Sequence, residues 1–533
     1  MSLATIHAMG AEPPLDEARV VVRNVSTRYL ALAVEMIVGL LVLPYNVAHL
    51  GKAAYGLWIL TTSITAYFSV LDLGYSGAVV KFVAHYRAKR DVTALNEILS
   101  TMGCAFSAFG LLTYLAALVV AVYLDRLFQL SPQEVQLGRA VLLVVSVNVA
   151  AGTAFSVFGG VINGFQRYDL NNVVGAVSSV LVAIVNVLVL AAGYGLVELV
   201  VATTIVRLLT YWAYRANAYR VFPGLRLRLR SFSVARLKEV TSFSVYMLLI
   251  DWANKVNYAV DAVVIGIFLN TGAVALWSVS QRLAETTQRL TNQLNDVLLP
   301  NVVDNDTASR LDGLQRIFLV GTRFSLATVV PLSVTLILLA QPLLNAWVGE
   351  SFTESELREG AIVLQVLALA VLARIGSATS GTLLKGAGRH RLVAVSNVVT
   401  AAANLSLSVL LIGPFNLTGV AIGTLVPVSV CAMFVLFPAG CQRVELPLGR
   451  ALAEAVWPAV WPGVVMAAFV MLSRPLWGAS LPAIGAEACA AVMVYAITFL
   501  RFGVSPAERR FCVAEFLTWS RRPRLVATAS ERA

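Results

Sequence analysis

Long apolar runs alternate with short polar gaps along this chain, and basic residues recur in every second gap. The gap after the run that ends near Val80 carries four cations, Lys81, Arg87, Lys89 and Arg90, whereas the gaps 193–198 and 270–272 hold no Lys or Arg. Basic loops resist translocation and stay on the cytoplasmic side of a membrane. The alternation therefore predicts an integral membrane protein that crosses the bilayer repeatedly in a fixed orientation.

Composition supports a membrane environment. The chain is 58% hydrophobic and 13% charged, with a mean hydropathy of +0.79, whereas soluble proteins are about 45–50% apolar and 25% charged. The net charge of +11 is spread over short loops without stacking aromatics, so it argues for membrane orientation rather than for a nucleic-acid partner. The five cysteines form no CxxC pair, which supports neither a disulfide framework nor a zinc site.

Fourteen windows are long enough to cross the hydrocarbon core, since a spanning helix needs about 20 mostly apolar residues. An even number places both termini on one side. Most of the 40 Lys and Arg residues fall in the N-tail, the even-numbered loops and the C-tail, so both termini are expected in the cytoplasm. The predicted outside segments hold only Lys52, Arg126, Arg139, Arg358 and Arg474. The longest of them, near 349–359, is acidic.

An internal repeat divides the spans into two sets of six. The segment 50–58 aligns with 269–277, sharing Leu, Ala, Leu and Trp in register, and Gly164, Arg167 and Leu170 align with Gly386, Arg389 and Leu392. Six spans between the copies predict a parallel repeat about an axis along the membrane normal. The predicted segments are an N-tail (1–25), a first lobe (26–214), a basic linker (215–241), a second lobe (242–440), two further spans (441–502) and a basic C-tail (503–533).

The seventh and eighth predicted spans carry polar stripes at helical spacing. One stripe comprises Asp251, Asn254, Lys255, Tyr258 and Asp261, and the other comprises Ser278, Gln281, Arg282, Glu285, Gln288, Arg289, Asn292, Asn295 and Asp296. Charges at bilayer depth are costly and usually face a bundle interior or water. The stripes therefore line a functional cavity, or they form intrahelical ion pairs such as Asp251–Lys255 and Arg282–Glu285 that lower the cost of burial.

Basic side chains outnumber acids in the spans, which suits an anionic solute because the guanidinium fork matches phosphate oxygens. The candidate substrate-binding residues are Arg282, Arg289, Lys255, Arg323, Arg374 and Arg207, with Gln281 and Asn292 beside them in the stripe. The candidate ion-coupling acids are Glu35, Asp261, Asp251 and Asp72, because an intramembrane carboxylate can bind a proton or cation. Asp72 could equally cap a turn.

Signals for catalysis are weak. The sequence lacks GxxxxGK[ST], GxSxG and HExxH, and no segment outside the spans is large enough for a catalytic domain. We therefore predict that the protein is not an enzyme and needs no cofactor beyond a possible coupling H⁺ or Na⁺.

Several motifs together resemble the Wzx-like oligosaccharide and polysaccharide flippases of the multidrug/oligosaccharidyl-lipid/polysaccharide (MOP) exporter superfamily. The residues that carry the resemblance are Asn24-Val25-Ser26, Leu50-Gly51, Tyr55-Gly56-Leu57-Trp58, Leu71-Asp72-Leu73-Gly74, Lys81-Phe82-Val83-Ala84-His85-Tyr86 and Gly164-Phe165-Gln166-Arg167-Tyr168-Asp169. The likeness is strongest over residues 20–220. It implies an all-α membrane fold of about 14 helices, with two pseudo-symmetric six-helix lobes as in MATE transporters and two C-terminal helices.

The resemblance also implies a function. The expected activity is translocation of an undecaprenyl-pyrophosphate-linked oligosaccharide across the bacterial inner membrane by alternating access, for surface or exopolysaccharide biosynthesis. The expected partners are the lipid-linked glycan, membrane lipids, and a polysaccharide polymerase with its chain-length machinery. Two alternatives stay open: a cation-coupled multidrug antiporter of the same superfamily, and a membrane-embedded polysaccharide polymerase or ligase.

Overall fold

The computed structural model describes residues 17–68, 75–241, 260–506 and 508–510, and these residues form helices joined by short connections. No strand occurs within those ranges, which confirms the all-α prediction. The chain packs as two compact units. Unit 1 comprises Met1–Ser280, Val348–Val363 and His390–Pro427, and unit 2 comprises Gln281–Trp347, Leu364–Arg389 and Val428–Ala533. The predicted lobe boundaries stay a prediction.

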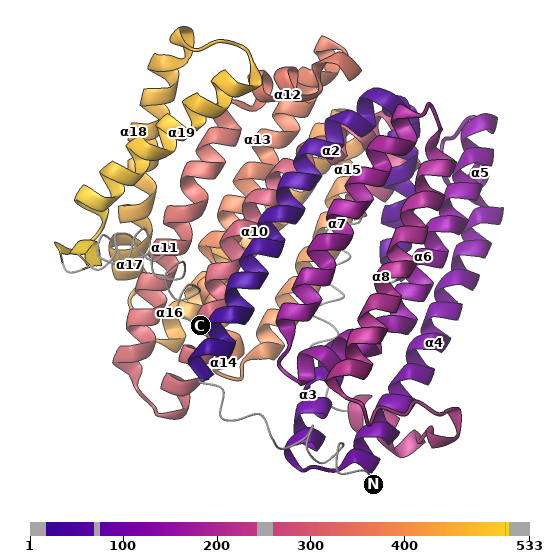
Figure 1. Cartoon of the computed structure of the whole chain (residues 1–533). Helices are drawn as coiled ribbons and strands as arrows, with labels where there is room; N and C mark the ends of the chain where they lie inside the picture. Colours follow the sequence, from indigo (N-terminus) through magenta and orange to yellow (C-terminus); the bar gives the residue numbers. More distant parts are fainter. Residues whose placement is uncertain (1–16, 69–74, 242–259, 507, 511–533) are drawn as a thin grey trace, which may run out of the picture. The chain divides into compact units, whose positions relative to one another are not determined.

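Unit 1 is built mainly from the N-terminal helices. They are α2 (Glu17–Phe68), α3 (Tyr75–Ala88), α4 (Val92–Val122), α5 (Leu124–Leu127), α6 (Pro132–Gly164), α7 (Tyr168–Ala191), α8 (Leu196–Val221) and the short 3₁₀ helix η2 (Leu229–Ser231). In Figure 1, α6 lies between α4 and α8, and α2 packs along α7. Helix α8 continues to Val221, so it includes the first residues of the predicted linker.

Unit 2 contains most of the later helices. The chain continues as α10 (Thr271–Thr307), α11 (Leu311–Leu338), α12 (Ala340–Val348), η3 (Gly349–Ser351), α13 (Glu354–Gly376), α14 (Ala378–Gly386), α15 (His390–Val430), η4 (Cys431–Leu436), α16 (Phe437–Arg443), α17 (Leu448–Ala451), η5 (Leu452–Val456), α18 (Trp457–Ser473), η6 (Arg474–Leu476), α19 (Leu481–Thr498) and η7 (Phe499–Gly503). The unit boundaries fall inside α10, α13 and α15 and before the last residue of α12. Three of the short elements, η4, η5 and η7, are π-helical.

Ten helices in the described part of the chain are long and apolar enough to cross a membrane. Two of these continuous segments each hold two predicted spans. Helix α2 breaks at Gly51 (φ 75°), where a positive φ favours glycine, and α15 breaks at Asn416 (φ 48°). Helix α10 is long enough to cross a membrane but less apolar than these ten, because it carries the second polar stripe. The membrane class is confirmed, whereas the total of fourteen is not.

Local sequence signals explain where several helices begin. Asp91 precedes α4, and its side chain accepts a hydrogen bond from the Ala94 amide. Ser131 and Glu134 form a reciprocal capping box before α6, with Pro132 in its first turn. Such caps satisfy amide groups that have no partner within the helix. These starts are therefore encoded locally, independently of tertiary packing.

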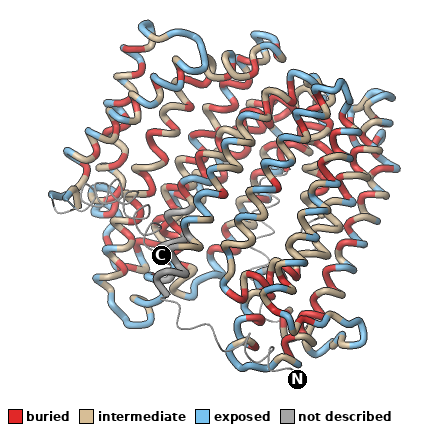
Figure 2. Tube along the Cα trace, in the orientation of Figure 1, coloured by how far each residue is buried: buried red, intermediate tan, exposed pale blue. Residues whose placement is uncertain are grey.

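The helices expose many large apolar side chains, as expected where lipid rather than water surrounds them. Leu41, Leu188, Leu209 and Leu472 are each more than half exposed, and Figure 2 shows exposed residues recurring along helices of both units. One buried core gathers residues of α3, α4, α6 and α8, with Ile98 and Phe222 among them. The helices therefore bury selected faces against each other and leave the others for the hydrocarbon.

Candidate functional site

A buried carboxylate lies in unit 1. Asp261 is 2% exposed, and its Oδ2 accepts a hydrogen bond from the Thr424 hydroxyl at 3.2 Å. Asn404 Nδ2 donates to Thr424 Oγ1 at 3.2 Å, and the Ser408 hydroxyl donates to Asn404 Oδ1 at 3.1 Å. Tyr67 of α2 lies within electrostatic range of the Asp261 carboxylate. We call these five residues the Asp261 cluster.

The Asp261 cluster has the chemistry of a site for a hard monovalent cation or a proton. Its atoms are mainly oxygens: a carboxylate, an amide oxygen and hydroxyls. Ser408 Oγ also reaches the Val420 carbonyl at 3.5 Å. Oxygen donors suit Na⁺ and H⁺ better than they suit softer metals. Within the ranges that the structure describes, no three His, Cys, Asp or Glu side chains gather as a multivalent metal site would require.

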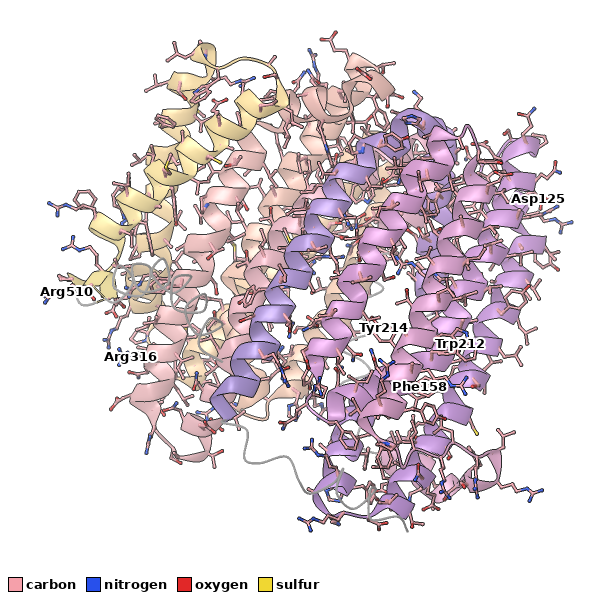
Figure 3. All side chains as sticks on the ribbon, viewed as in Figure 1. Asp125, Phe158, Trp212, Tyr214, Arg316 and Arg510 are labelled. Atoms are coloured by element: carbon pink, nitrogen blue, oxygen red, sulfur yellow. The ribbon has the colours of Figure 1, made fainter. Side chains whose placement is uncertain are left out.

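A second acid in unit 1, Glu35 of α2, faces α7 and α8. A Cβ added at Gly175 would lie 3.5 Å from the Tyr214 hydroxyl and 3.8 Å from Glu35 Oε1, so both groups reach the same point on α7. Tyr214 (labelled in Figure 3) also lies in the electrostatic field of Arg207. The next tyrosine on α8, Tyr211, donates to Asn148 Oδ1 of α6 at 2.8 Å. Glu35, Tyr214, Tyr211 and Arg207 are called the Glu35 cluster.

Unit 2 contains one acid among several arginines. Glu285 of α10 pairs with Arg289 one turn later, at 3.5 Å between Nη2 and Oε2. Arg282 and Arg374, the latter near the end of α13, also interact electrostatically with this carboxylate. Three guanidinium groups against one carboxylate leave an excess of positive charge in this part of unit 2. We call Arg282, Glu285, Arg289 and Arg374 the Glu285 cluster.

Exposure differs between the arginines of the Glu285 cluster. The Arg289 side chain is 52% exposed and that of Glu285 is 23% exposed. An ion pair between partly exposed groups contributes little to stability, so Arg289 can exchange its partner for a solute anion at low cost. Of the polar residues in the same stripe, Gln288 is buried, whereas Gln281 and Asn292 are half-buried. The observed ion pair is Glu285–Arg289 rather than the predicted Arg282–Glu285.

Arg323 occupies a different setting in unit 2. Its Nη1 contacts Glu508 Oε2 at 3.0 Å, and its Nε donates to the Glu454 carbonyl at 3.0 Å in the π-helical η5. The Arg323 side chain is only 14% exposed. Both interactions hold the segment after η7 and the turn before α18 against α11. We therefore leave Arg323 out of the substrate-binding set that we propose below.

Several predicted residues cannot be placed. Lys255, Asp251 and Asp72 lie outside the described residues. Within the described residues, Arg282, Arg289 and Arg374 all interact with Glu285 in unit 2. In unit 1, Glu35 and Arg207 both interact electrostatically with Tyr214. Asp261 lies in a separate buried network. Sequence reasoning missed the partners of Asp261, although Asn404 and Ser408 stand one turn apart in an apolar helix and could have indicated them.

Polar contacts join several segments of unit 1 that the charge pattern predicts to lie on the outer side of the membrane. Lys52 Nζ lies 2.6 Å from Glu356 Oε1, and Thr271 Oγ1 donates to Glu134 Oε1 at 2.6 Å. The Leu417 amide donates to Glu359 Oε1 at 3.2 Å. These outer-end contacts connect residues that are more than a hundred positions apart, except for the last pair.

The two copies of the predicted repeat meet at this outer end. A side chain added at Gly56 would overlap the Thr271 carbonyl and would lie 3.1 Å from the Ala275 amide nitrogen. One at Gly272 would lie 3.7 Å from the Lys52 side chain. The segments 50–58 and 269–277 therefore pack directly against each other, with glycines permitting the close approach.

Together, the spanning helices and the charged clusters within them define a multi-pass helical membrane protein. Residues 21–305 match the model of the family described as polysaccharide biosynthesis protein. The chain belongs to this family, and the predicted resemblance is confirmed.

Two curated relatives are similar over much of the chain. The Bacillus subtilis protein named uncharacterized membrane protein EpsK is 21% identical over 413 residues, which cover 74% of this chain and 77% of that protein. The Haloferax volcanii protein named probable flippase AglR is 20% identical over 312 residues, which cover 58% of this chain and 61% of that protein.

Solved structures share the fold. The lipid II flippase MurJ, in its inward closed conformation, superposes with a TM-score of 0.71 at 13% identity, covering 89% of this chain and 97% of that one. An inward-facing MATE multidrug transporter of the MOP superfamily gives a TM-score of 0.66 at 15% identity, covering 77% of this chain and 94% of that one. At such identities the likeness establishes the fold, which is the predicted one, and leaves the transported molecule open.

Proposed function

We propose that this protein is a flippase that moves an undecaprenyl-pyrophosphate-linked oligosaccharide across the bacterial inner membrane, for surface or exopolysaccharide biosynthesis. The observation that carries the proposal is the Glu285 cluster, where Arg289 pairs with a carboxylate that also interacts electrostatically with Arg282 and Arg374. A pyrophosphate supplies the negative charge that this cluster lacks, and guanidinium groups bind its oxygens bidentately. The family match and the name of the Haloferax relative support the same activity.

The proposed mechanism is alternating access. The outer-end contacts join helices of unit 1 at the end predicted to be outside, so we expect the substrate to enter from the cytoplasmic leaflet. Binding of the pyrophosphate would draw Arg289 from Glu285, because the more highly charged anion competes for the same guanidinium. The outer-end contacts would then have to break for release. The Lys52–Glu356 pair is suited to this, since its side chains are 41% and 31% exposed and such pairs contribute about 0.2–1 kcal/mol.

We assign coupling to a cation, H⁺ or Na⁺, at the Asp261 cluster, with the Glu35 cluster as a second candidate. A buried carboxylate is costly when it is charged and uncompensated, so occupation by a cation changes the energy of this region by several kcal/mol. That energy is available to drive a conformational change. The proposed partners are the lipid-linked glycan, membrane lipids, and a polymerase with its chain-length machinery, and both termini are proposed to be cytoplasmic.

A reconstituted system tests the function. The protein is placed in vesicles with a fluorescent undecaprenyl-pyrophosphate disaccharide, and a glycosidase added outside measures how much substrate reaches the outer leaflet. Arg289→Ala should slow translocation at least about tenfold, since one charge-assisted hydrogen bond contributes roughly 1.5–3 kcal/mol. Arg391→Ala, at an exposed arginine in the first turn of α15, is the matched control and should translocate normally.

Two outcomes would contradict the proposal. Wild-type rates for Arg289→Ala, with equal amounts of inserted protein, would remove this residue from the site. Absence of translocation by the wild type, together with drug sensitivity in a strain that lacks the protein, would favour the multidrug antiporter instead.

A further inference from the structure

The linker that follows α8 is folded onto the beginning of α4 (Figure 1). The Asn96 side chain donates to the Gly224 carbonyl at 2.9 Å and accepts from the Arg226 amide at 2.7 Å. Ser100 Oγ accepts from the Arg228 amide at 3.1 Å. Thr101 Oγ1 accepts from the Ser233 amide at 3.1 Å. Side chains of α4 therefore fix the linker backbone over ten residues, so this segment presents a preformed surface.

The linker alternates leucine and arginine, and over residues 225–228 the backbone sorts them to opposite faces. Arg228 has extended backbone angles (φ −134°, ψ 129°), and successive side chains of an extended chain point to opposite sides. Leu225 is 3% exposed and Leu227 packs against the same core, whereas Arg226, Arg228 and Arg230 are exposed. Among the residues that the structure describes, none accepts a hydrogen bond or forms an ion pair with these three guanidinium groups.

Arg236, also in the linker, is paired with side chains of the protein itself. Arg236 Nε lies 3.1 Å from Glu97 Oε2 and its Nη1 lies 3.0 Å from Glu239 Oε2. Its Nη1 also donates to the Tyr86 hydroxyl at 2.7 Å. Arg236 therefore anchors the linker within the protein, and the three outward arginines remain available for a partner outside it. Apolar side chains stand among them, since Leu229 is 83% and Val234 57% exposed.

The depth of the linker follows from the length of α4. A helix crosses the hydrocarbon core in about 20 residues at 1.5 Å per residue. Counted back from Val122, where α4 ends, the opposite boundary of the hydrocarbon falls close to Thr101. The hydrogen bonds to Ser100 and Thr101 therefore hold Arg228 and Ser233 at the level of the lipid headgroups, on the side predicted to be cytoplasmic.

We propose that the linker is a binding surface for the anionic membrane, in which Arg226, Arg228 and Arg230 contact lipid phosphates and Leu229 inserts between the headgroups. Anionic lipids attract juxtamembrane basic residues, and an apolar side chain among them adds burial. This inference concerns the N-terminal unit and its lipid contacts, so it goes beyond the proposed transport activity and does not depend on it.

The test measures the depth of residue 229 in the full-length protein. Leu229→Cys is introduced into a chain whose native cysteines are replaced, and it carries a fluorophore that is quenched by lipids with a quencher near the headgroup. The vesicles contain three parts phosphatidylethanolamine to one part phosphatidylglycerol, or phosphatidylcholine alone. Quenching should be strong in the anionic vesicles and weaker in the neutral ones. It should also weaken at high salt, where screening shortens the range of the attraction.

Variants identify the contact. Replacing Arg226, Arg228 and Arg230 with Gln should lower the preference for anionic vesicles about fivefold per arginine, as expected for about 1 kcal/mol each. Replacing all three with Lys should retain it. The charge-matched control replaces with Gln three exposed arginines elsewhere in the chain, namely Arg310 before α11, Arg316 in α11 and Arg391 in the first turn of α15; Arg316 is labelled in Figure 3. This control should quench like the wild type.

Three outcomes would overturn the inference. Equal quenching in anionic and neutral vesicles would show that the arginines act only in membrane orientation. An unchanged Gln triple variant would remove these residues from the contact. Release of the fluorophore from the membrane by millimolar inorganic pyrophosphate, at constant ionic strength, would assign the surface to the headgroup of a transported lipid.

Discussion

Asp261 is the acid whose surroundings are most completely defined. It is nearly inaccessible, and Thr424 connects it to Asn404 in a network that lies entirely inside unit 1. A carboxamide keeps the size of the side chain and removes its charge. Asp261→Asn should therefore abolish the dependence of translocation on an ion gradient while the protein still folds. The measurement is the translocation rate in vesicles with imposed Na⁺ or H⁺ gradients.

A conservative change of Thr424, the hydrogen-bond partner of Asp261, is the control for Asp261→Asn. Thr424→Ser keeps the hydroxyl that Asp261 accepts from, so the gradient dependence should persist. A gradient response in Asp261→Asn equal to that of the wild type would transfer the coupling role to the Glu35 cluster.

Glu508 provides a pH-dependent contact outside the spans. Burial opposes its ionisation, but hydrogen bonds from Ser505 and the nearby Arg323 guanidinium outweigh this and hold the pKa of Glu508 below its ordinary value. A carboxyl with a lowered folded-state pKa stabilises the protein above its unfolded-state pKa of about 4.3, and this stabilisation is lost as the pH falls through the folded value. The Arg323–Glu508 pair should therefore weaken as the pH falls below the unfolded-state pKa of about 4.3.

Thermal unfolding of the detergent-solubilised protein measures this effect. The Tm difference between wild type and Glu508→Gln should be present at pH 7 and should shrink at pH values below 4. Glu445→Gln, at a carboxyl for which no hydrogen bond or ion pair links it to another described side chain, is a control for the charge change alone. A Tm difference that does not change with pH would show that Glu508 acts through packing instead.

At the scale of elements, the close approach of α2 and α10 depends on Gly56. A Cβ there would overlap the Thr271 backbone, and backbone atoms cannot move aside as a flexible side chain can. Gly56→Ala should cost about 1–3 kcal/mol of stability through overpacking, and it should weaken closure of the outer end. Thermal unfolding reports the first effect, and reaction of a cysteine introduced at Lys52 with an impermeant reagent reports the second.

Gly103→Ala is the matched control for the helix contact. Gly103 lies in the interior of α4, and a Cβ there meets nothing within 4 Å, so alanine should stabilise the helix by up to about 1 kcal/mol. If both variants had the same stability and the same reactivity at position 52, the contact between the two repeat copies would not determine closure.

The elements also show what the sequence can and cannot predict. The apolar runs identify most helices because lipid selects for length and composition, and Asp91 and Ser131 signal two helix starts locally. The partners of Asp261 and Glu35 could not be predicted in the same way. Asn404, Thr424 and Tyr214 come from helices more than a hundred residues away, and helical spacing describes one helix at a time. The pairing of Arg323 with Glu508 could not be predicted for the same reason, since 185 positions separate the two residues.

At the scale of the whole molecule, the mechanism that we propose has the outer-end contacts open in every cycle. Cysteines at Lys52 and Glu356 should therefore be joined by a short bifunctional reagent, because the native side chains meet at 2.6 Å. Cross-linked protein should translocate no substrate, and cleavage of a reducible linker should restore the rate. Each single cysteine variant treated with the same reagent is the control, and it should keep most of its activity. Normal translocation by fully cross-linked protein would show that the Lys52–Glu356 contact does not open during transport.

The attachment of the linker to α4 has a consequence for how the chain is made. Asn96, Ser100 and Thr101 leave the ribosome long before Gly224, Arg226, Arg228 and Ser233, with which they bond. Until those later residues emerge, the polar groups on the first turns of α4 must be satisfied by water or by lipid headgroups. The helices up to α8 therefore form before the end of unit 1 that is predicted to be cytoplasmic can fold, and a nascent chain that stops at residue 221 lacks the segment that completes it.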